Sequence, residues 1–254
     1  MNTLLIDVGN TRIKWGLVRD GQIAELGGRV HAGRGAVAAA AVTKAMKGRQ
    51  FKGVMVSNVA GPSFATNLNR ALSSRYGIEP RFAHVGRQKL GIRCGYRDPK
   101  RLGVDRWMAV LAAHKTTGCG ALVIDAGTTL TIDGVTADGV HLGGLIIPGP
   151  QLMARALRRE TSDIGLVVMQ GDIDSQGFLG RSTTEAVNMG SGLALVGAVD
   201  RALHFLKRDL GPNPKVLVTG GDGEDLLPHL KVKAQLRPAL VLEGLALFAG
   251  ARLA

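Results

Sequence analysis

Two copies of one short pattern constrain this chain more than any other feature of its sequence. The first copy is an apolar run that ends at Asp7, a short turn at residues 8–11, and a second apolar run. The same plan begins again at Asp125, near the middle of the 254-residue chain. Apolar runs broken by glycine and small polar residues are typical of two buried strands joined by a tight turn. The repeat predicts that a domain opening with this hairpin has been duplicated.

The turn of the first hairpin carries residues suited to binding a phosphate. Gly9 lets backbone N–H groups come close to a bound anion, and Asn10 and Thr11 add short polar donors. Lys14 adds a mobile positive charge, and the Asp7 carboxylate can hold a hydrated Mg²⁺. A single copy is equally well explained as an ordinary turn that contains asparagine. Two copies that face each other across a cleft would grip a nucleoside triphosphate from both sides, and we adopt this interpretation.

Length and composition limit the classes of protein to which the chain can belong. The length suits one large or two small domains, and the repeat favours two. No apolar run approaches the roughly 18–20 residues of a membrane-spanning helix, and the start of the chain lacks the pattern of a signal peptide. Cys94 and Cys119 are isolated, which suits the reducing cytoplasm and argues against a disulfide or a zinc site. We therefore expect a cytoplasmic protein that does not enter a membrane.

The formal net charge of +12 raises the alternative of a nucleic-acid-binding protein. The positive residues are scattered, however, and aromatic residues make up only 4% of the chain, which argues against a base-stacking surface. The densest group of cations, in residues 87–106, surrounds a candidate site. Attraction of a polyanionic nucleotide and an acidic substrate accounts for this charge, so we expect no nucleic acid partner. A nucleic-acid role would instead predict DNA binding that falls steeply with salt.

Hydrophobic periodicity and turn residues predict an α/β fold. In the first half we predict strands at 3–8, 12–18, 22–30, 54–57 and 81–85, helices at 35–48, 62–75 and 104–116, and a basic loop at 86–103. In the second half we predict strands at 121–126, 129–135, 139–147 and 215–219, a helix after Pro150, a loop at 161–181, and helices at 184–210 and 238–253. The first half has the element order of a ribonuclease H-like domain, and the second half repeats its opening. We therefore predict two duplicated ribonuclease H-like domains, residues 1–117 and 118–254, with a central cleft.

Several motifs together make the chain similar to one family. They are Asp7-Val8-Gly9-Asn10-Thr11 with Lys14, Tyr96 with Pro99, Gly103-Val104-Asp105-Arg106-Trp107, Asp125-Ala126-Gly127-Thr128, His141-Leu142-Gly143-Gly144 through Pro148-Gly149, and Thr183 seven residues before Gly190. Over nearly its whole length the chain resembles the type III pantothenate kinases, or Bvg accessory factor family, of the superfamily of acetate and sugar kinases, Hsp70 and actin. The two Asp-x-Gly turns indicate only this superfamily, whereas the Gly-x-Asp-Arg-Trp motif is much more specific to the family.

This resemblance implies a reaction and a set of ligands. The family transfers the γ-phosphoryl group of ATP to the primary hydroxyl of pantothenate, which is the first step of coenzyme A biosynthesis. The resemblance implies two actin-like ATPase domains, Mg²⁺, and a monovalent cation, either potassium or ammonium. It also implies a homodimer whose pantothenate pocket lies at the subunit interface.

The resemblance further implies a role for each motif residue of this chain. The ATP-binding first phosphate loop would consist of Asp7, Val8, Gly9, Asn10, Thr11, Arg12, Ile13 and Lys14. Asp7 would organise Mg²⁺ through water, Thr128 would contact ATP, and Asp125 would bind the monovalent cation. The pantothenate-binding residues would be Tyr96, Gly103, Val104, Asp105, Arg106 and Thr183. Asp105 would be the general base.

The residues near the substrate also allow plainer roles. Asp105 stands at the start of a predicted helix, where the helix dipole keeps a carboxylate ionised but also favours a simple capping acid. Arg106 offers a planar donor fork to an acidic substrate, although it could also be a surface cation. Trp107 suits packing better than stacking on the substrate. Either Thr183 or Thr184 could simply cap the helix that follows.

Two other classes of protein fit part of the pattern. A regulator could keep the fold without turnover, but it would not need Asp7, Asp105 and Asp125 together. A sugar or acetate kinase of the same superfamily should lack the Gly-x-Asp-Arg-Trp motif, and such a sugar kinase is usually longer. We therefore predict a pantothenate kinase.

Overall fold

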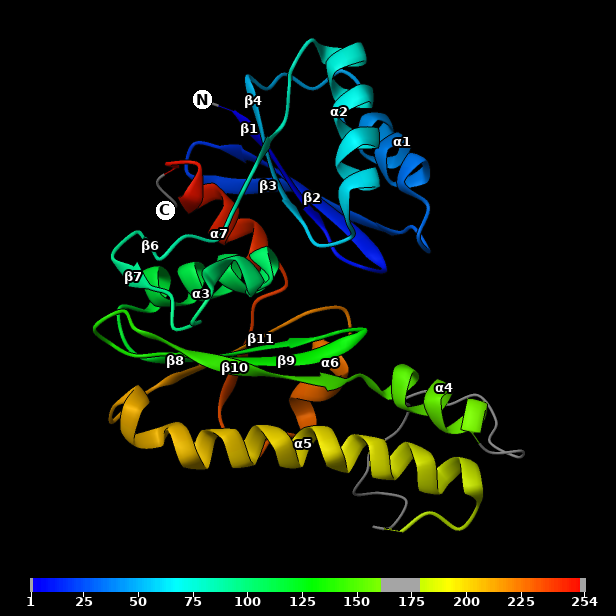
Figure 1. Cartoon of the computed structure of the whole chain (residues 1–254), viewed down its shortest axis with the longest axis vertical. Helices are drawn as coiled ribbons and strands as arrows, with labels where there is room; N and C mark the ends of the chain where they lie inside the picture. The colour runs from blue at the N-terminus through cyan, green and yellow to red at the C-terminus, as the bar shows by residue number, and fades with distance from the viewer. Residues whose placement is uncertain (1, 161–178, 252–254) are drawn as a thin grey trace. The chain divides into compact units, whose positions relative to one another are not determined.

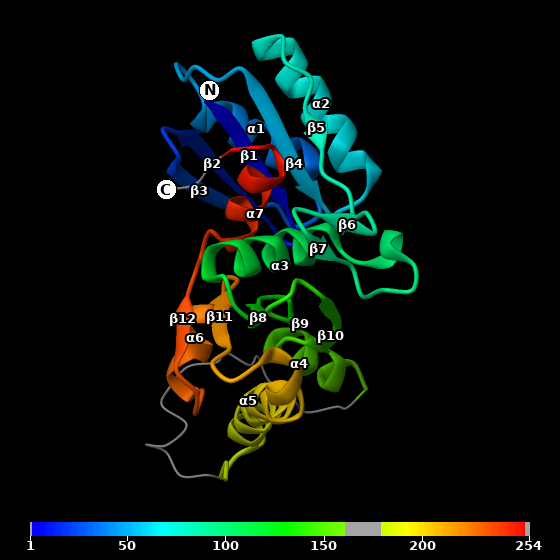
Figure 2. The ribbon, with the colours of Figure 1, turned by 90° about the vertical axis from the view of Figure 1, so that its left-hand side faces the viewer.

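The computed structural model describes residues 2–160 and 179–251. The chain forms two compact units, each built on a five-stranded sheet (Figures 1 and 2). Unit 1 consists of Met1–Thr116 and Ala239–Ala254, and unit 2 consists of Thr117–Pro238.

The sheet of unit 1 has the strand order β3-β2-β1-β4-β5. Its strands are β1 (Thr3–Val8), β2 (Arg12–Arg19), β3 (Gln22–Val30), β4 (Gly53–Asn58) and β5 (Arg81–Phe82). β1 pairs antiparallel with β2, and β2 with β3, whereas β4 runs parallel to β1 and β5 parallel to β4. The two-residue turn between β2 and β3 uses Asp20 and Gly21, which both have positive φ and therefore suit a tight hairpin.

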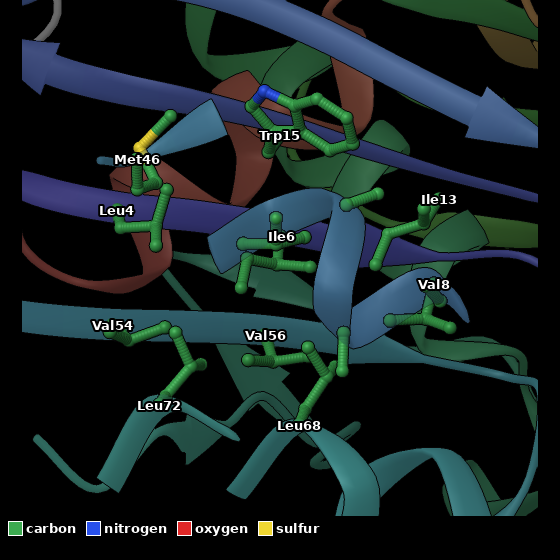
Figure 3. Packing of buried hydrophobic residues seen from close by; sticks show 14 of the residues in the cluster. Leu4, Ile6, Val8, Ile13, Trp15, Met46, Val54, Val56, Leu68 and Leu72 are labelled. Atoms are coloured by element: carbon green, nitrogen blue, oxygen red, sulfur yellow. The ribbon is translucent and has the colours of Figure 1, made fainter. Parts of the chain in front are cut away.

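One face of this sheet is buried beneath α1 (Gly35–Ala45) and α2 (Pro62–Tyr76). Alternate residues of β1, namely Leu4, Ile6 and Val8, pack in one cluster with Leu68 and Leu72 of α2 (Figure 3). All five side chains are fully buried. The period of two in the strand and of about 3.6 in the helix bring these residues together. This cluster fixes the end of β1 and therefore the start of the first hairpin.

The last helix of the chain corrects the predicted domain boundary. We expected the second domain to run to residue 254, but α7 (Leu240–Phe248) groups with unit 1. It crosses α3 (Val104–Thr117) so closely that a Cβ on Gly244 would lie 2.0 Å from the Met108 carbonyl oxygen. The sequence repeat shows where each domain begins. It does not show where the chain leaves unit 2 and rejoins unit 1.

Unit 2 repeats the sheet of unit 1, with the order β10-β9-β8-β11-β12. Its strands are β8 (Ala121–Ala126), β9 (Thr129–Val135), β10 (His141–Pro148), β11 (Lys215–Thr219) and β12 (Ala234–Leu236). The first three strands pair antiparallel and the last two are parallel, as in unit 1. The same order and the same directions confirm the predicted duplication of a ribonuclease H-like fold.

The main helices of unit 2 are α4 (Pro150–Glu160) and α5 (Thr183–Leu210), with a short α6 (Gly223–Leu226) and a 3₁₀ turn at Leu227–His229. Leu195 and Val199 of α5 share one core with Ile124 and Ile132 of the sheet. Among the helices in the described ranges, none has both the length and the apolar character needed to cross a membrane.

Several short elements differ from the predictions. The predicted basic loop at 86–103 contains a hairpin of β6 (Gln88–Lys89) and β7 (Ile92–Arg93) and a 3₁₀ turn at Pro99–Arg101. The predicted strand at 81–85 is reduced to the two residues of β5, and β12 was not predicted at all. Strands of two or three residues are too short to show an alternating pattern. The predicted loop at 161–181 lies mostly outside the described residues.

Candidate active site

The first hairpin places a carboxylate and a cation side by side. Its turn is closed by a hydrogen bond from the Gly9 N–H to the Arg12 carbonyl oxygen at 3.0 Å. Asp7, near the end of β1, is in register with Lys14 on β2 and with Ser57 on β4. Directly paired residues point to the same face of a sheet, so these three side chains are neighbours. That face is opposite to the one on which alternate residues of β1 meet α2.

The other side chains of the predicted first phosphate loop differ in their exposure to solvent. Val8 and Ile13 are fully buried, so only their backbone groups can serve a ligand. Asn10 and Arg12 are exposed at the tip of the turn, and Thr11 is half-buried between them. The structure therefore presents the Asn10 and Thr11 donors at the open end of the hairpin.

Ser57 is a site residue that sequence reasoning missed. Its side chain is fully buried, and its hydroxyl has no hydrogen-bond partner among the residues that the structure describes. A buried hydroxyl without a partner is costly, which favours a role for it with a ligand. In the sequence, Ser57 is only a polar residue at the end of an apolar run. The pairing of β4 with β1 is needed to show that it lies beside Asp7.

The second hairpin repeats this arrangement with one difference. Its turn is closed by a hydrogen bond from the Gly127 N–H to the Thr129 carbonyl oxygen at 3.1 Å. Asp125 on β8 is in register with Thr131 on β9 and with Thr219 on β11. Two hydroxyl residues therefore flank this carboxylate, and the position that holds a lysine in the first hairpin holds a threonine here.

Close backbone packing fixes the second turn from two sides. The Gly149 N–H donates to the Thr128 carbonyl oxygen at 3.0 Å, and a Cβ on Gly149 would lie 2.4 Å from the Gly127 carbonyl oxygen. Gly220 has a positive φ of 98°, and a Cβ there would lie 2.0 Å from the Ala126 carbonyl oxygen. Only glycine fits either position, so the turn is clamped between two glycine backbones. Thr128 itself remains exposed.

The structure brings together Arg106 and Tyr96, two residues of the predicted pantothenate site. The Arg106 Nη1 donates to the Tyr96 hydroxyl at 2.9 Å, and the guanidinium carbon lies 5.7 Å from the centre of the tyrosine ring. Arg106 is only 6% exposed, so the alternative that it is a surface cation is wrong. Trp107, the next residue, is fully buried, so it packs in the core of unit 1.

Asp105 lies in the first turn of α3, where its carboxylate is held in one orientation. Its Oδ1 accepts a hydrogen bond from the Arg106 N–H at 2.7 Å. A Cβ on Gly103 would lie 2.6 Å from this Oδ1, so the carboxylate folds back over the glycine. The capping contact that we considered therefore exists. The same contact joins the half-buried carboxylate to the backbone of Arg106, whose side chain is buried and bonds to the half-buried Tyr96.

Thr183 belongs to unit 2, whereas Tyr96 and Asp105 belong to unit 1. The capping role considered for Thr183 or Thr184 is wrong, because Ser182 caps α5 by accepting the Glu185 N–H at 3.2 Å. Thr183 is exposed and lines an apolar cavity of about 610 Å³ between α4 and α5. The other residues lining this cavity are Pro148, Leu152, Met153, Ala156, Leu157, Ala186, Val187, Gly190 and Ser191.

Comparison with solved structures defines the fold class. A Baf family protein from Campylobacter jejuni has a TM-score of 0.56 and 19% identity, over 97% of each chain. A ROK family glucokinase from Streptomyces griseus, in complex with glucose and AMPPNP, has a TM-score of 0.53 and 13% identity, over 99% of this chain and 99% of that chain. At these identities the likeness shows the fold alone, which is that of the actin-like ATPases and the ROK sugar kinases.

Comparison of sequences defines the family. The profile of the type III pantothenate kinases matches residues 3–204. The type III pantothenate kinase of an Azoarcus species is 38% identical over 258 residues, which cover 98% of this chain and 90% of that protein. The type III pantothenate kinase of Nitrosococcus oceani is 35% identical over 249 residues, which cover 96% of this chain and 92% of that protein.

The chain therefore belongs to the type III pantothenate kinase family, as its motifs predicted. It is a kinase that uses ATP to phosphorylate an alcohol, and its reaction is the phosphorylation of pantothenate in coenzyme A biosynthesis. This result decides against the sugar kinase and the regulator without turnover.

Proposed function

We propose that Asp105 is the general base when this kinase transfers the γ-phosphoryl group of ATP to the primary hydroxyl of pantothenate. The carboxylate accepts the hydroxyl proton, a bond forms between this oxygen and the γ-phosphorus, and the bond to the β-phosphate oxygen breaks to release ADP. The observation that carries the assignment is the Asp105 carboxylate, held by the backbone N–H of Arg106, whose buried guanidinium bonds to Tyr96. A positioned base of this kind contributes about 10²–10⁴-fold to the rate.

We assign the phosphate oxygens of ATP to the first hairpin. Asn10, Thr11 and Lys14 would hold these oxygens, with backbone groups of residues 8–13 completing the loop. Because phosphoryl transfer has a loose transition state, positioning and neutralisation of charge dominate its catalysis.

We also assign Mg²⁺ to Asp7, through water. Mg²⁺ usually keeps several waters and takes one or two carboxylates together with substrate phosphates, so a single buried carboxylate beside the Ser57 hydroxyl fits this ion. When bound, the ion would neutralise charge that develops on the phosphate oxygens.

The second hairpin would contact ATP through Thr128 and hold potassium or ammonium at Asp125. The support for a monovalent cation is the chemistry of the donors, since the register neighbours of Asp125 are the hydroxyl residues Thr131 and Thr219. Oxygen donors of this type suit a hard cation. The clamp formed by Gly149 and Gly220 would keep Thr128 in place for ATP.

Pantothenate would bind at Tyr96, at Gly103 through Arg106, and at Thr183. The Arg106 guanidinium is a planar donor fork suited to the carboxylate of pantothenate, and its hydrogen bond to Tyr96 holds it in one orientation. The cations of residues 87–106 would raise the local concentration of both anionic substrates.

We propose that the enzyme is a homodimer and that Asp105 and Thr183 of one pocket come from different subunits. Two exposed apolar side chains of α5, Leu193 and Phe205, support this assembly. The two free cysteines suit the reducing cytoplasm, where we propose that the reaction takes place.

Mixing two inactive variants tests the shared pocket. In a mixed dimer of Asp105→Asn and Thr183→Val subunits, one pocket carries both changes and the other carries neither. Random exchange of subunits should therefore restore about a quarter of the wild-type activity. Pockets built from one chain would each carry one change, and mixing would restore nothing.

The function itself is tested by a coupled assay of ADP release with ATP, Mg²⁺ and pantothenate, in potassium and then in sodium alone. We expect turnover in potassium that falls about 10²–10⁴-fold in Asp105→Asn. If the folded protein bound ATP but showed no turnover in potassium, the assigned acceptor would be wrong.

A further inference from the structure

The buried side chain of His31 joins the first hairpin to the turn that follows β3. Its Nε2 lies 2.9 Å from the Gly9 carbonyl oxygen, and its Nδ1 accepts the Gly33 N–H at 3.1 Å. His31 is fully buried, and no motif of the family resemblance includes it. Both ring nitrogens are therefore committed to backbone groups.

These two contacts define the tautomer of the ring. Because Nδ1 accepts a hydrogen bond from an N–H group, the proton must lie on Nε2. The Nε2–H then donates to the Gly9 carbonyl. The other tautomer would place a lone pair against that carbonyl and a hydrogen against the Gly33 N–H, so it fits neither contact.

The position of the ring is fixed by its surroundings as well. The His31 backbone N–H donates to the Thr11 carbonyl oxygen at 3.0 Å, and its own carbonyl accepts the Arg34 N–H at 2.8 Å across a tight turn. The ring packs against Phe64 of α2, with the ring centres 4.6 Å apart. His31 thus holds the first hairpin at two carbonyl groups, those of Gly9 and Thr11.

The contact to Gly9 has a consequence for the open end of the hairpin. A trans peptide is planar, so the carbonyl of Gly9 and the N–H of Asn10 point in opposite directions. Holding the Gly9 carbonyl toward the buried ring therefore turns the Asn10 N–H away from it. Amide N–H groups held in this way form a preorganised anion site.

We propose that His31 is a positioning residue that aims the Asn10 backbone N–H at a phosphate oxygen of ATP. The inference rests on the proposed role of the first hairpin as the ATP phosphate loop. His31 touches neither ATP nor pantothenate in this assignment, and it acts only through the Gly9–Asn10 peptide.

Two substitutions separate the two ring contacts. In His31→Gln the side-chain amide nitrogen can take the place of Nε2 and donate to Gly9. In His31→Asn the amide oxygen can take the place of Nδ1 and accept from Gly33, but no donor reaches Gly9. Phe64→Leu is the matched control, because it removes the ring packing and leaves both hydrogen bonds.

Binding of Mg²⁺ with the non-hydrolysable analogue AMPPNP, measured by calorimetry, is the readout. We expect His31→Asn to weaken binding by about three- to tenfold, as for the loss of one hydrogen bond. The KM for ATP should rise with it, while the KM for pantothenate stays unchanged. His31→Gln and Phe64→Leu should bind within about twofold of wild type, although Phe64→Leu loses thermal stability.

The outcomes separate this inference from the function on which it rests. If the wild-type protein does not bind the analogue, the proposed phosphate loop is wrong. If wild type binds and His31→Asn binds equally well, or if His31→Asn and His31→Gln weaken binding equally, His31 does not act through Gly9. Nitrogen NMR of the wild-type ring adds a test that needs no variant, since a proton on Nδ1 would also overturn the inference.

Discussion

Replacing Gly103 by alanine tests the role of Asp105 by displacing its carboxylate without replacing the residue. The added Cβ would lie 2.6 Å from the Asp105 Oδ1, which is closer than non-bonded atoms approach. The carboxylate is the flexible end of a side chain, so it should rotate away and give up its 2.7 Å hydrogen bond from the Arg106 N–H. A reacting group displaced by about 1 Å can cost about 10²-fold in rate.

The expected result is a fall in kcat of about 10- to 100-fold. The Gly103 carbonyl, which accepts the Trp107 N–H at 3.0 Å and starts α3, is retained in alanine. We therefore expect the free energy of unfolding to fall by only about 0.5–1 kcal/mol, the cost of alanine at the start of a helix. The assay is the coupled release of ADP, with thermal unfolding measured on the same samples.

A double variant decides whether the loss acts through Asp105. In the Asp105→Asn background, Gly103→Ala should lower kcat by no more than about twofold, because the group that it displaces no longer acts as a base. Gly53→Ala is the matched control, since a Cβ at Gly53 meets no atom within 4 Å. Wild-type kcat in Gly103→Ala, or full additivity in the double variant, would refute the reasoning.

Three further predictions concern the hairpins. Gly220→Ala should lower the free energy of unfolding, measured in urea, by about 3 kcal/mol or more. The added Cβ would lie 2.0 Å from the Ala126 carbonyl oxygen, and the φ of residue 220 is positive. Ser57→Ala should keep or raise the melting temperature, because it removes a buried hydroxyl without a described partner, yet lower kcat/KM for ATP about threefold to tenfold. Thr131→Lys should place an ammonium group beside Asp125 and give activity in sodium buffer, and continued dependence on potassium would count against the cation site.

The sequence was sufficient to predict the features of the fold that depend on local pattern. The apolar run that ends at Asp7 predicted β1, and the second Asp-x-Gly turn predicted the repeat of the sheet. Both signals lie within about a dozen residues, so single-sequence patterns detect them. The position of α7 depends instead on a close crossing with α3, which leaves no periodic mark in the sequence.

The same distinction holds for the candidate site. Asp7 and Lys14 could be found from the residues of the first hairpin, and Asp105 from the family resemblance. Ser57 and His31 could not, because each becomes a neighbour of the first hairpin only when distant segments pair. A serine at the end of a strand and a lone histidine have many ordinary explanations when only the sequence is considered.

The two hairpins differ at one of the two positions beside their carboxylates, and the roles that we propose for them differ as well. In both units the carboxylate has a hydroxyl residue beside it on the parallel strand, Ser57 for Asp7 and Thr219 for Asp125. The antiparallel neighbour differs, because Lys14 stands beside Asp7 where a threonine stands beside Asp125. In the proposed assignment the lysine supplies positive charge for phosphate oxygens, while the second carboxylate has only neutral register neighbours, so none of these neighbours repels a bound potassium or ammonium ion. We therefore attribute the proposed phosphate contact of the first copy's lysine and the proposed monovalent cation of the second copy to this one position of each hairpin.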